Sequence, residues 1–392
     1  MKPVTGLWLN PRLPPLRLVA LGFLLVGPGL PAWLPAAQDR ARAELTFPNP
    51  PGYQTLKCDF HAHTVFSDGA VWPTIRVEEA WRDGLDAIAI SDHLEYQPHR
   101  SDVSTNYERS FELARAAAAP LDILVIRAAE ITRGEPPGHM NALFLKAVTP
   151  LRREDYRDAV RAAVEQGGFV FWNHPGWKQP DRKSVWYAEQ GELLAKGWLH
   201  GIEVINGAEY DPIAHQWCLD RKLAMLANSD VHGPIAWDYP AEERQHRPLT
   251  LVFAERRTLD AIREALLARR TVLYSQHTLY GEATWLQPLF HGALELRSGP
   301  VRLQGTTRGF AQVFNRSPVT FDLESLGRVP EVNVPKRVRL HAGKTSLIEL
   351  TPRTNNLSGV RTLRLPFRAT NLKTTPDQSL EVTLDVPVEF VR

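Results

Sequence analysis

The chain has only two cysteines, Cys58 and Cys218, among 392 residues. A fold held together by several disulfides is therefore excluded, although a single bridge between these two is not. We favour the interpretation that both are buried free thiols, which pack as small apolar side chains. The scarcity of thiolates also argues against a structural zinc site built from cysteines.

An excess of either charge is also missing. The 46 Lys and Arg against 44 Asp and Glu leave a formal net charge of +2. Nucleic acid and membrane surfaces are therefore not indicated as partners, because no domain-wide basic excess is available to displace counterions from a polyanion. A composition that is 43% hydrophobic and 23% charged is typical of a globular protein with a substantial core.

The N-terminus has an apolar run, "LVALGFLLVG", that is too short for a comfortable membrane-spanning helix. Three basic residues precede it, and small residues follow it up to "PAAQDRARAE", which is the pattern of an export signal. We predict a signal peptide and leader over residues 1–43, with cleavage after Ala37 or Ala43. The mature protein is then expected to be periplasmic or secreted, with no stable membrane span. An uncleaved anchor and a cytosolic N-terminus are the alternatives.

Between residues 55 and 275, apolar runs of strand length alternate with helical patterns. Runs such as "DAIAI", "DILVI" and "FVFW" are typical of strands buried on both faces, as in parallel sheets covered by helices. We therefore predict an α/β barrel over residues 44–280. The expected strands are 55–60, 87–90, 123–127, 142–146, 169–172, 202–205, 224–227 and 249–254. The expected helices are 73–83, 106–119, 152–166, 185–196, 212–221 and 259–269.

After about residue 280 the pattern changes. Short alternating strands punctuated by Pro, Gly and Asn, with no convincing helical period, predict an all-β sandwich over residues 281–392. The chain is thus expected to have two domains.

The stretch "HAHTVFSDG" at residues 61–69 directly follows the first expected strand. His61 and His63 are one residue apart, so in an extended segment both side chains project to the same side and can converge on one metal ion. Taken alone, two solvated histidines in a loop explain the motif equally well.

Residues able to bind metal recur near the ends of the other expected strands. In a parallel barrel the C-terminal ends of all strands open on one face, so these side chains should meet in a single cup. Imidazoles mixed with carboxylates suit Zn, Mn or Fe, and nine ligands are enough for two or three divalent ions. The candidate ligands are His61, His63, Asp68, His93, Glu130, His139, His174, Asp230 and His232.

Four of these motifs, "HAHTVFSDG", "ISDH", "NHP" and "SDVH", resemble in order and spacing those of the polymerase and histidinol phosphatase (PHP) superfamily of metal-dependent phosphoesterases. The resemblance implies a distorted barrel of seven strands, a (β/α)7 PHP-type barrel, and commonly a trinuclear centre. It assigns His61, His63, Glu130 and Asp230 to one ion, Glu130, His139 and His174 to a second, and Asp68, His93 and His232 to a third.

A closer resemblance is carried by "KCDFHAHTVFSDGAVWPTIRVEEAWRDGLDAIAISDHLEYQPH" and "AAEITRGEPPGHMNALFLK". These segments are similar to the exported bacterial phosphodiesterases of the Sb-PDE family. The similarity implies hydrolysis of phosphodiesters, including organophosphate diesters, with a small-molecule phosphoester as substrate. A phosphomonoesterase, or a carbamate or carboxylic ester hydrolase with the same polynuclear centre, is the alternative.

Such a centre supports attack of a metal-bridging hydroxide on phosphorus, with Asp230 as a candidate general base and no residue standing out as the acid. From another class, a binding module that has lost catalysis is disfavoured, because every expected ligand type is present.

Four further residues are candidates for supporting roles. Asp92 is expected to orient His93 or cap a turn rather than bind metal. Tyr96 and His99 lie on an expected rim loop, and Arg133 has the chemistry to clamp a phosphate oxygen. For all three candidate substrate-binding residues a structural role, or pairing with a neighbour or with solvent, remains the alternative. The sequence leaves the oligomeric state open.

Overall fold

The computed structural model describes residues 41–240 and 246–391. The predicted signal peptide and leader thus fall outside the described residues, apart from residues 41–43. No helix in the described part of the chain is both long enough and apolar enough to cross a membrane.

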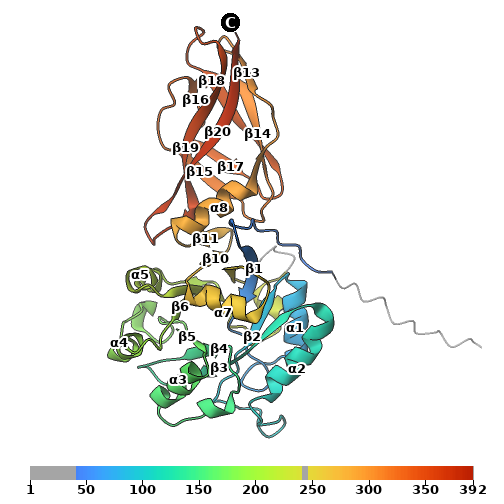
Figure 1. Cartoon of the computed structure of the whole chain (residues 1–392), viewed down its shortest axis with the longest axis vertical. Coiled ribbons are helices and arrows are strands. Elements are labelled where there is room, and N and C mark those ends of the chain that lie inside the picture. Colours follow the sequence, from blue (N-terminus) through green and yellow to red (C-terminus); the bar gives the residue numbers. More distant parts are fainter. Residues whose placement is uncertain (1–40, 241–245, 392) are drawn as a thin grey trace, which may run out of the picture. The chain divides into compact units, whose positions relative to one another are not determined.

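The first part of the fold is a curved mixed sheet covered by helices (Figure 1). Parallel pairing links β1, β2 and β3 and, separately, β5, β6 and β8. On β9, the Thr250 hydroxyl accepts from the amide of Ala227 on β8 and donates to its carbonyl, so a side chain joins the two ends of the curved sheet. The strands are β1 Gln54–Asp59, β2 Ala87–Ile90, β3 Leu124–Ile131, β4 Met140–Leu143, β5 Phe169–Trp172, β6 Gly201–Asn206, β7 Glu209–Tyr210, β8 Ala224–Asn228 and β9 Leu249–Ala254.

All the helices and strands predicted between residues 55 and 275 are present, with ends shifted by a few residues. Each main helix buries one face against the strands; on α3, for example, Tyr156, Ala159, Val160 and Ala163 are buried at helical spacing. The helices are α1 Pro73–Arg82, α2 Arg109–Ala118, α3 Tyr156–Glu165, α4 Ala188–Ala195, α5 Pro212–Arg221, α6 Ile235–Asp238, α7 Leu259–Leu267 and α8 Ala283–Ala293.

The expectation of a wholly parallel barrel is wrong for two strands. β4 runs antiparallel to both β3 and β5, and β9 runs antiparallel to β1. β4 also begins two residues earlier than predicted. The start of β4 therefore lies at the same edge as the C-terminal ends of β3 and β5, and His139, which precedes β4, points to the same end of the sheet as residues that follow the parallel strands.

The C-terminal part is an all-β domain of two layers. One layer contains β13, β20, β19, β15 and β17, and the other contains β12, β14, β18 and β16. The strands are β12 Leu294–Leu296, β13 Val301–Gln304, β14 Gly309–Asn315, β15 Phe321–Ser325, β16 Val332–Asn333, β17 Arg337–Leu340, β18 Thr345–Pro352, β19 Gly359–Lys373 and β20 Ser379–Val391.

Helix α8 lies within the range predicted to contain only strands, so that expectation is corrected. Its interior proline, Pro288, breaks the usual helical pattern of the sequence. The helix nevertheless forms because Leu286, Leu289, Phe290 and Ala293 fall on one buried face. Tertiary packing therefore outweighs the unfavourable local sequence.

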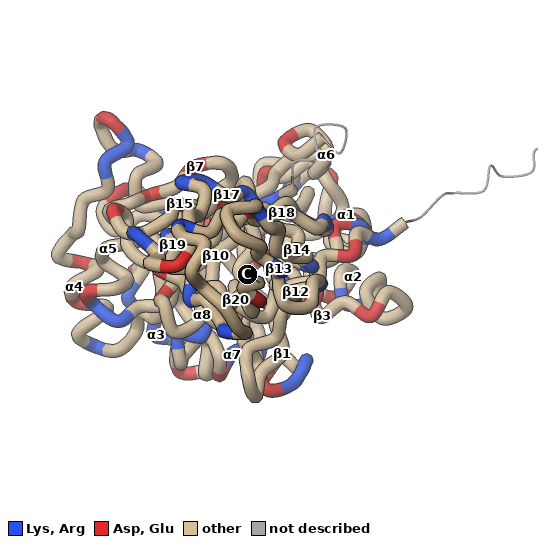
Figure 2. Tube along the Cα trace, turned by 90° about the horizontal axis from the view of Figure 1, so that it is seen from above, with Lys and Arg blue, Asp and Glu red and all other residues tan. Residues whose placement is uncertain are grey.

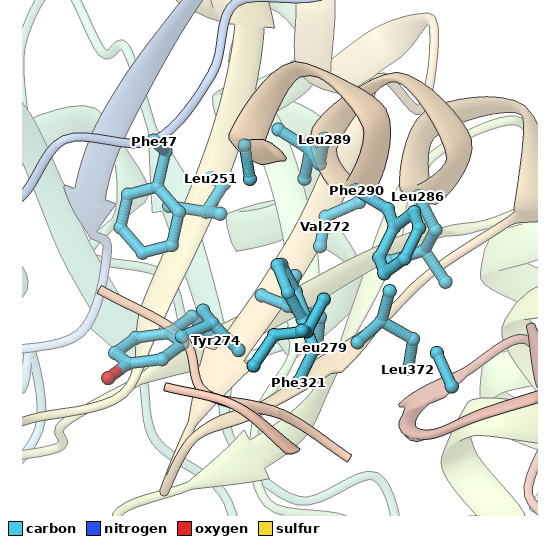
Figure 3. Close-up of a cluster of buried hydrophobic side chains, with 14 of the residues drawn as sticks. Phe47, Leu251, Val272, Tyr274, Leu279, Leu286, Leu289, Phe290, Phe321 and Leu372 are labelled. Atoms are coloured by element: carbon cyan, nitrogen blue, oxygen red, sulfur yellow. The ribbon is translucent and has the colours of Figure 1, made fainter. Parts of the chain in front are cut away.

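The two parts share one apolar core, which Figure 3 shows around α8. Leu251 of β9 and Val272 of β10 (Thr271–Ser275) belong to the same cluster as Phe321 of β15 and Leu372 of β19. The backbone is also continuous across this region, because β11 (Thr278–Tyr280) pairs with both β10 and β19. The barrel and the C-terminal domain are therefore expected to unfold together.

We expect Phe321→Ala to lower the free energy of unfolding by about 3–5 kcal/mol, because a large buried ring is replaced by a cavity. Urea denaturation followed by tryptophan fluorescence and by far-UV circular dichroism should show one shifted transition. Phe310→Ala is the matched control, since Phe310 lies in the same domain with 41% of its surface exposed, and its cost should be about 0.5 kcal/mol or less. Two separate transitions would contradict the shared core.

Candidate metal centre

Side chains able to bind metal gather at one edge of the curved sheet. Seven of them follow or end β1, β2, β3, β5 and β8, an eighth, His139, precedes the antiparallel β4, and Asp68 lies in the loop after β1. All nine residues predicted as ligands are in groups whose ligand atoms lie within 4.8 Å of one another: His61, His63, Asp68, His93, Glu130, His139, His174, Asp230 and His232. The structure therefore brings together residues that span about 170 positions of the sequence.

One group has spacings that fit an ion directly. The Nε2 atoms of His61 and His63 lie 3.0 Å apart, and Asp230 Oδ1 lies 3.1 Å from each of them. Glu130 Oε2 lies beside the group, 3.4 Å from His63 and 3.6 Å from His61. Ligands bound at about 2.1 Å in tetrahedral or octahedral geometry lie roughly 3.0–3.4 Å from each other. The atoms of His61, His63 and Asp230 are thus spaced as ligands of one ion would be.

Glu130 lies between this group and three further imidazoles. Its Oε1 is 2.9 Å from His139 Nδ1 and 3.7 Å from His174 Nε2, while its Oε2 is 2.8 Å from His93 Nδ1. The carboxylate is fully buried, and Asn173 Nδ2 fixes its orientation by donating to Oε1 at 2.8 Å. Its position between imidazoles on several sides is suited to a bridging ligand.

Asp68 lies close to three imidazoles, those of His232, His93 and His63. Its Oδ1 lies 3.3 Å from His232 Nε2, 3.5 Å from His93 Nε2 and 3.8 Å from His63 Nδ1. Gly69 allows this approach, since a Cβ at position 69 would lie only 2.8 Å from the backbone of His63. The glycine of "SDG" is therefore required by close packing.

Three carboxylate oxygens in the cup, Asp68 Oδ1, Glu130 Oε2 and Asp230 Oδ1, are buried and accept no hydrogen bond. An anionic oxygen without a donor is costly to bury unless a cation compensates it. The mixture of imidazole and carboxylate donors matches the preference of zinc, manganese and iron. The residues present therefore fit divalent metal ions.

The charges of the cup are strongly coupled. Burial opposes protonation of His93, but Glu130 and Asp68 outweigh it and raise the pKa of His93 to about 10. Burial likewise lowers the pKa of His61, but Asp230 and Glu203 raise it more strongly. Burial favours the neutral acid at Glu130, yet His93 and His61 hold its pKa well below the ordinary value. The cup thus holds ionised carboxylates that attract positive charge, whether as protons or as metal ions.

Glu203 on β6 is a residue of the centre that was not predicted. Its Oε1 lies 3.0 Å from His61 Nδ1, which leaves His61 Nε2 facing the other ligand atoms. Its two oxygens also accept from Asn228 Nδ2, Asn206 Nδ2 and the amide of His174. The signal in the sequence was an acidic residue within the apolar strand "GIEVIN", where a buried carboxylate needs several partners.

Arg76 on α1 was also missed, and it ties two ligand-bearing loops together. Its fully buried guanidinium donates to the carbonyls of His63 and His232 at 3.1–3.2 Å and to that of Gly233 at 3.0 Å. Glu79, one turn later, pairs with Arg76 at 2.6 Å and accepts from the amide of Ile235. Arginine is suited to this task because its planar donors can serve several carbonyls at once.

Backbone strain also concentrates here. Asp230 and His174 have φ values of +50° and +28°, which are unfavourable for residues with a Cβ. Such conformations persist where surrounding contacts fix them, and they are commonly found at functional sites. Both residues turn sharply immediately after a strand, which directs their side chains into the cup.

Asp92 stabilises the turn of the "HAHTVFSDG" stretch at residues 64–67. It accepts from the amide and hydroxyl of Thr64 and from the hydroxyl of Ser67, so of its two expected roles it performs that of a turn cap. His93 instead contacts Thr132 Oγ1 through its Nδ1 at 2.6 Å.

The three candidate substrate-binding residues are placed differently. Tyr96 is half exposed, with its ring 6.1 Å from that of His93, so it borders the cup. His99 is exposed on the same loop. Arg133 pairs with Glu95 and donates to the carbonyls of Thr132 and Arg153, so its guanidinium is already engaged and does not join the cup.

We expect Glu203→Gln to weaken metal retention about 10–100-fold. The glutamine amide is neutral and has one acceptor oxygen, so it cannot accept all the hydrogen bonds that the two oxygens of Glu203 accept. Metal content after dialysis against graded chelator concentrations measures the effect. Glu209→Gln is the matched control, because Glu209 is an exposed carboxylate in the adjacent strand β7 that pairs with Arg182. Equal metal retention in both variants would show that Glu203 does not support the centre.

Comparison with solved structures identifies a two-domain protein from Bacteroides vulgatus that contains a predicted PHP-like metal-dependent phosphoesterase. It is 42% identical to this chain, covers 88% of it and 99% of its own length, and superposes with a TM-score of 0.82. A proposed metal-dependent phosphoesterase from Bifidobacterium adolescentis and an amidohydrolase from Chromobacterium violaceum match 45% of the chain and 88% of their own lengths. They are 19% and 18% identical, with TM-scores of 0.36 and 0.35, so the family assignment rests on the Bacteroides structure.

Residues 294–385 match an Ig-like domain family, and no curated protein matches the chain. Because the Bacteroides protein is matched over almost its full length, the chain belongs to the PHP-like metal-dependent phosphoesterases, with an Ig-like domain at its C-terminus.

Proposed function

We propose that the protein is a metal-dependent phosphodiesterase that holds two to three divalent ions, Zn, Mn or Fe. The observation that carries the proposal is the set of three buried carboxylate oxygens without a hydrogen-bond donor, surrounded by six imidazoles, in a member of the PHP-like family. Bound ions supply positive charge to phosphoryl oxygens and lower the pKa of water, which is the chemistry that ester hydrolysis needs.

The ligand sets inferred from the sequence agree in part with the groups in the structure. His61, His63 and Asp230 form one group, and Asp68, His93 and His232 form another that also includes His63. Glu130 groups with His61 and His174 on one side and with His93 and His139 on the other, so the set Glu130, His139 and His174 is divided between two groups.

Asp230 is the residue that we propose as the general base. Asn206 Nδ2 donates to its Oδ2 at 3.1 Å, which fixes the carboxylate, while Oδ1 accepts no hydrogen bond and faces His61 and His63. An oriented, ionised carboxylate at the centre is placed to accept a proton from a water molecule held beside it.

The charges around the cup favour a diester over a monoester. In the described part of the chain, no lysine or arginine pairs with Asp68, Glu130 or Asp230, and Arg76 and Arg133 are committed to backbone carbonyls and to Glu79 and Glu95. A phosphomonoester dianion needs more cationic donors than a diester monoanion, so this centre suits the less charged substrate.

A small molecule is the proposed partner. Along the tube of Figure 2, positions of Lys and Arg alternate with positions of Asp and Glu, and this mixture does not favour a nucleic acid backbone as the partner.

We expect the purified mature protein to hydrolyse bis(p-nitrophenyl) phosphate faster than p-nitrophenyl phosphate, and to contain two to three ions per chain. Chelation should abolish turnover, and Mn or Zn should restore it. Glu130→Gln, which keeps the size of the side chain but removes its charge, should lower both metal content and kcat at least 100-fold with the circular dichroism spectrum unchanged. The exposed Glu112→Gln on α2 is the control.

The result that would reverse the proposal is full metal occupancy without cleavage of the diester. Cleavage of the monoester alone would then identify a phosphomonoesterase. Cleavage of neither phosphate would direct the assay to carbamates and carboxylic esters.

We further propose that the protein is exported to the periplasm or secreted, with cleavage after Ala37. Arg42 donates to the carbonyls of Trp81 and Leu85, and the Ala43 amide donates to that of Arg82, so cleavage after Ala43 would remove contacts made by the folded chain. N-terminal sequencing of the exported protein should find a start between about residues 38 and 44, with residue 38 as the expected start. Retention of Met1 would contradict export.

A further inference from the structure

A cleft of about 490 Å³ opens beside the metal centre. Its lining includes His174, which contacts Glu130, and Glu203, which contacts His61. Asn206, the hydrogen-bond donor to Asp230, is also part of the wall. The cleft and the cup therefore share side chains, and a substrate whose phosphorus lies at the centre can extend one of its ester groups into the cleft.

Apolar side chains also line the cleft, and Trp177 is an exposed one. The indole ring lies 5.1 Å from the His139 ring and 5.2 Å from the His174 ring, yet 47% of the residue is exposed. Lys178 Nζ lies 4.3 Å from the centroid of the indole ring. Val204 and Ile213 also line the cleft. The exposed part of the indole leaves apolar surface in water beside candidate metal ligands, and a ligand that covers this surface gains free energy.

The charged residues of the cleft do not form a second site for an anion. Asp211 caps the start of α5 and accepts from the Ser184 hydroxyl, and Arg182 is paired with Glu209. Lys183 is the remaining cation of the lining, and Asp181 lies two residues before it. Four acidic residues and two basic ones line the cleft altogether, so a second phosphate or a polyphosphate chain is disfavoured there.

We propose that this cleft binds an uncharged apolar ester group of the substrate, either an aromatic ring or a branched aliphatic group, while the phosphoryl group lies at the metal centre. The inference rests on the proposed function and deepens it, because it names the class of diester that the centre acts on. Trp177 is then the residue that determines this preference. The volume is ample for one such group, since small-molecule sites commonly measure about 300–1,000 Å³.

The test compares two ligands that share a phosphonate head and differ only in the apolar group. Binding of phenylphosphonate and of methylphosphonate to the metal-loaded full chain is measured by calorimetry, without any turnover. We expect phenylphosphonate to bind about tenfold more tightly to the wild type, because one apolar group in a matching pocket gives discrimination of roughly that size. Trp177→Ala should remove most of this difference, and Trp177→Phe should restore part of it.

Trp237→Ala is the matched control. Trp237 is 75% exposed and lines a different cleft, of about 810 Å³, so its loss should leave the phenyl preference intact. Equal binding of the two phosphonates by the wild type would overturn the proposal, as would failure of either ligand to bind the loaded protein. A loss of preference in Trp237→Ala but not in Trp177→Ala would also overturn it, because the ring would then lie in the other cleft.

The same experiment separates this proposal from the proposed function. A phenyl preference that depends on Trp177, in a protein that cleaves no phosphodiester, would keep the cleft and reject the diesterase. Turnover of bis(p-nitrophenyl) phosphate by a protein with no phenyl preference would support the diesterase and reject the proposed role of the cleft.

Discussion

The constraint on which the structure depends is the burial of three carboxylates at one point of the fold. Asp68, Glu130 and Asp230 each direct an oxygen without a hydrogen-bond donor into a space bounded by imidazoles. Such oxygens are stable only with positive charge nearby, so metal binding and the stability of the loops that carry them are thermodynamically linked. The strand ends thus place ionised carboxylates where positive charge is needed to compensate them.

Polar residues around the cup fix the orientation of the candidate ligands and join the loops that carry them. Arg76 and Glu79 join the loop after β1 to the loop after β8 by contacts with backbone, while Glu203 and Asn206 set the orientation of His61 and Asp230. Behind them, Asp59 accepts from Ser229 and pairs with the buried Arg247, which also pairs with Asp83. Ligand atoms are held closely when their neighbours are themselves fixed by several bonds, and this explains why strained backbone at Asp230 and His174 is tolerated.

The sequence predicted which candidate ligands gather at one edge of the sheet, because their placement follows from local features of the chain. The spacing of His61 and His63, and the repeated placement of His, Asp and Glu near strand ends, depend on chain order and periodicity, which a single sequence displays. Spacing and strand ends did not identify Glu203 and Arg76, since each has a partner more than 100 residues away, His61 for Glu203 and Gly233 for Arg76. The direction of β4 was missed because an apolar run of four residues looks the same in either direction. The ion pair between Arg133 and Glu95 was missed because the sequence alone does not specify which nearby acidic residue an arginine in a loop will pair with.

The Ig-like domain bears on the site through a short series of contacts. Tyr210, which lines the cleft beside the centre, packs against Tyr280 with ring centroids 4.5 Å apart. Tyr280 pairs with Lys373 of β19, and Asn371 on the same strand donates to the carbonyl of His277 at 2.6 Å. One wall of the cleft is therefore supported by a strand of the C-terminal domain, and the shared core around α8 fixes that strand relative to the barrel. Because a closely packed interior transmits strain, removing the domain would change the shape of the cleft as well as the stability of the protein, even though the candidate metal ligands all lie in the barrel.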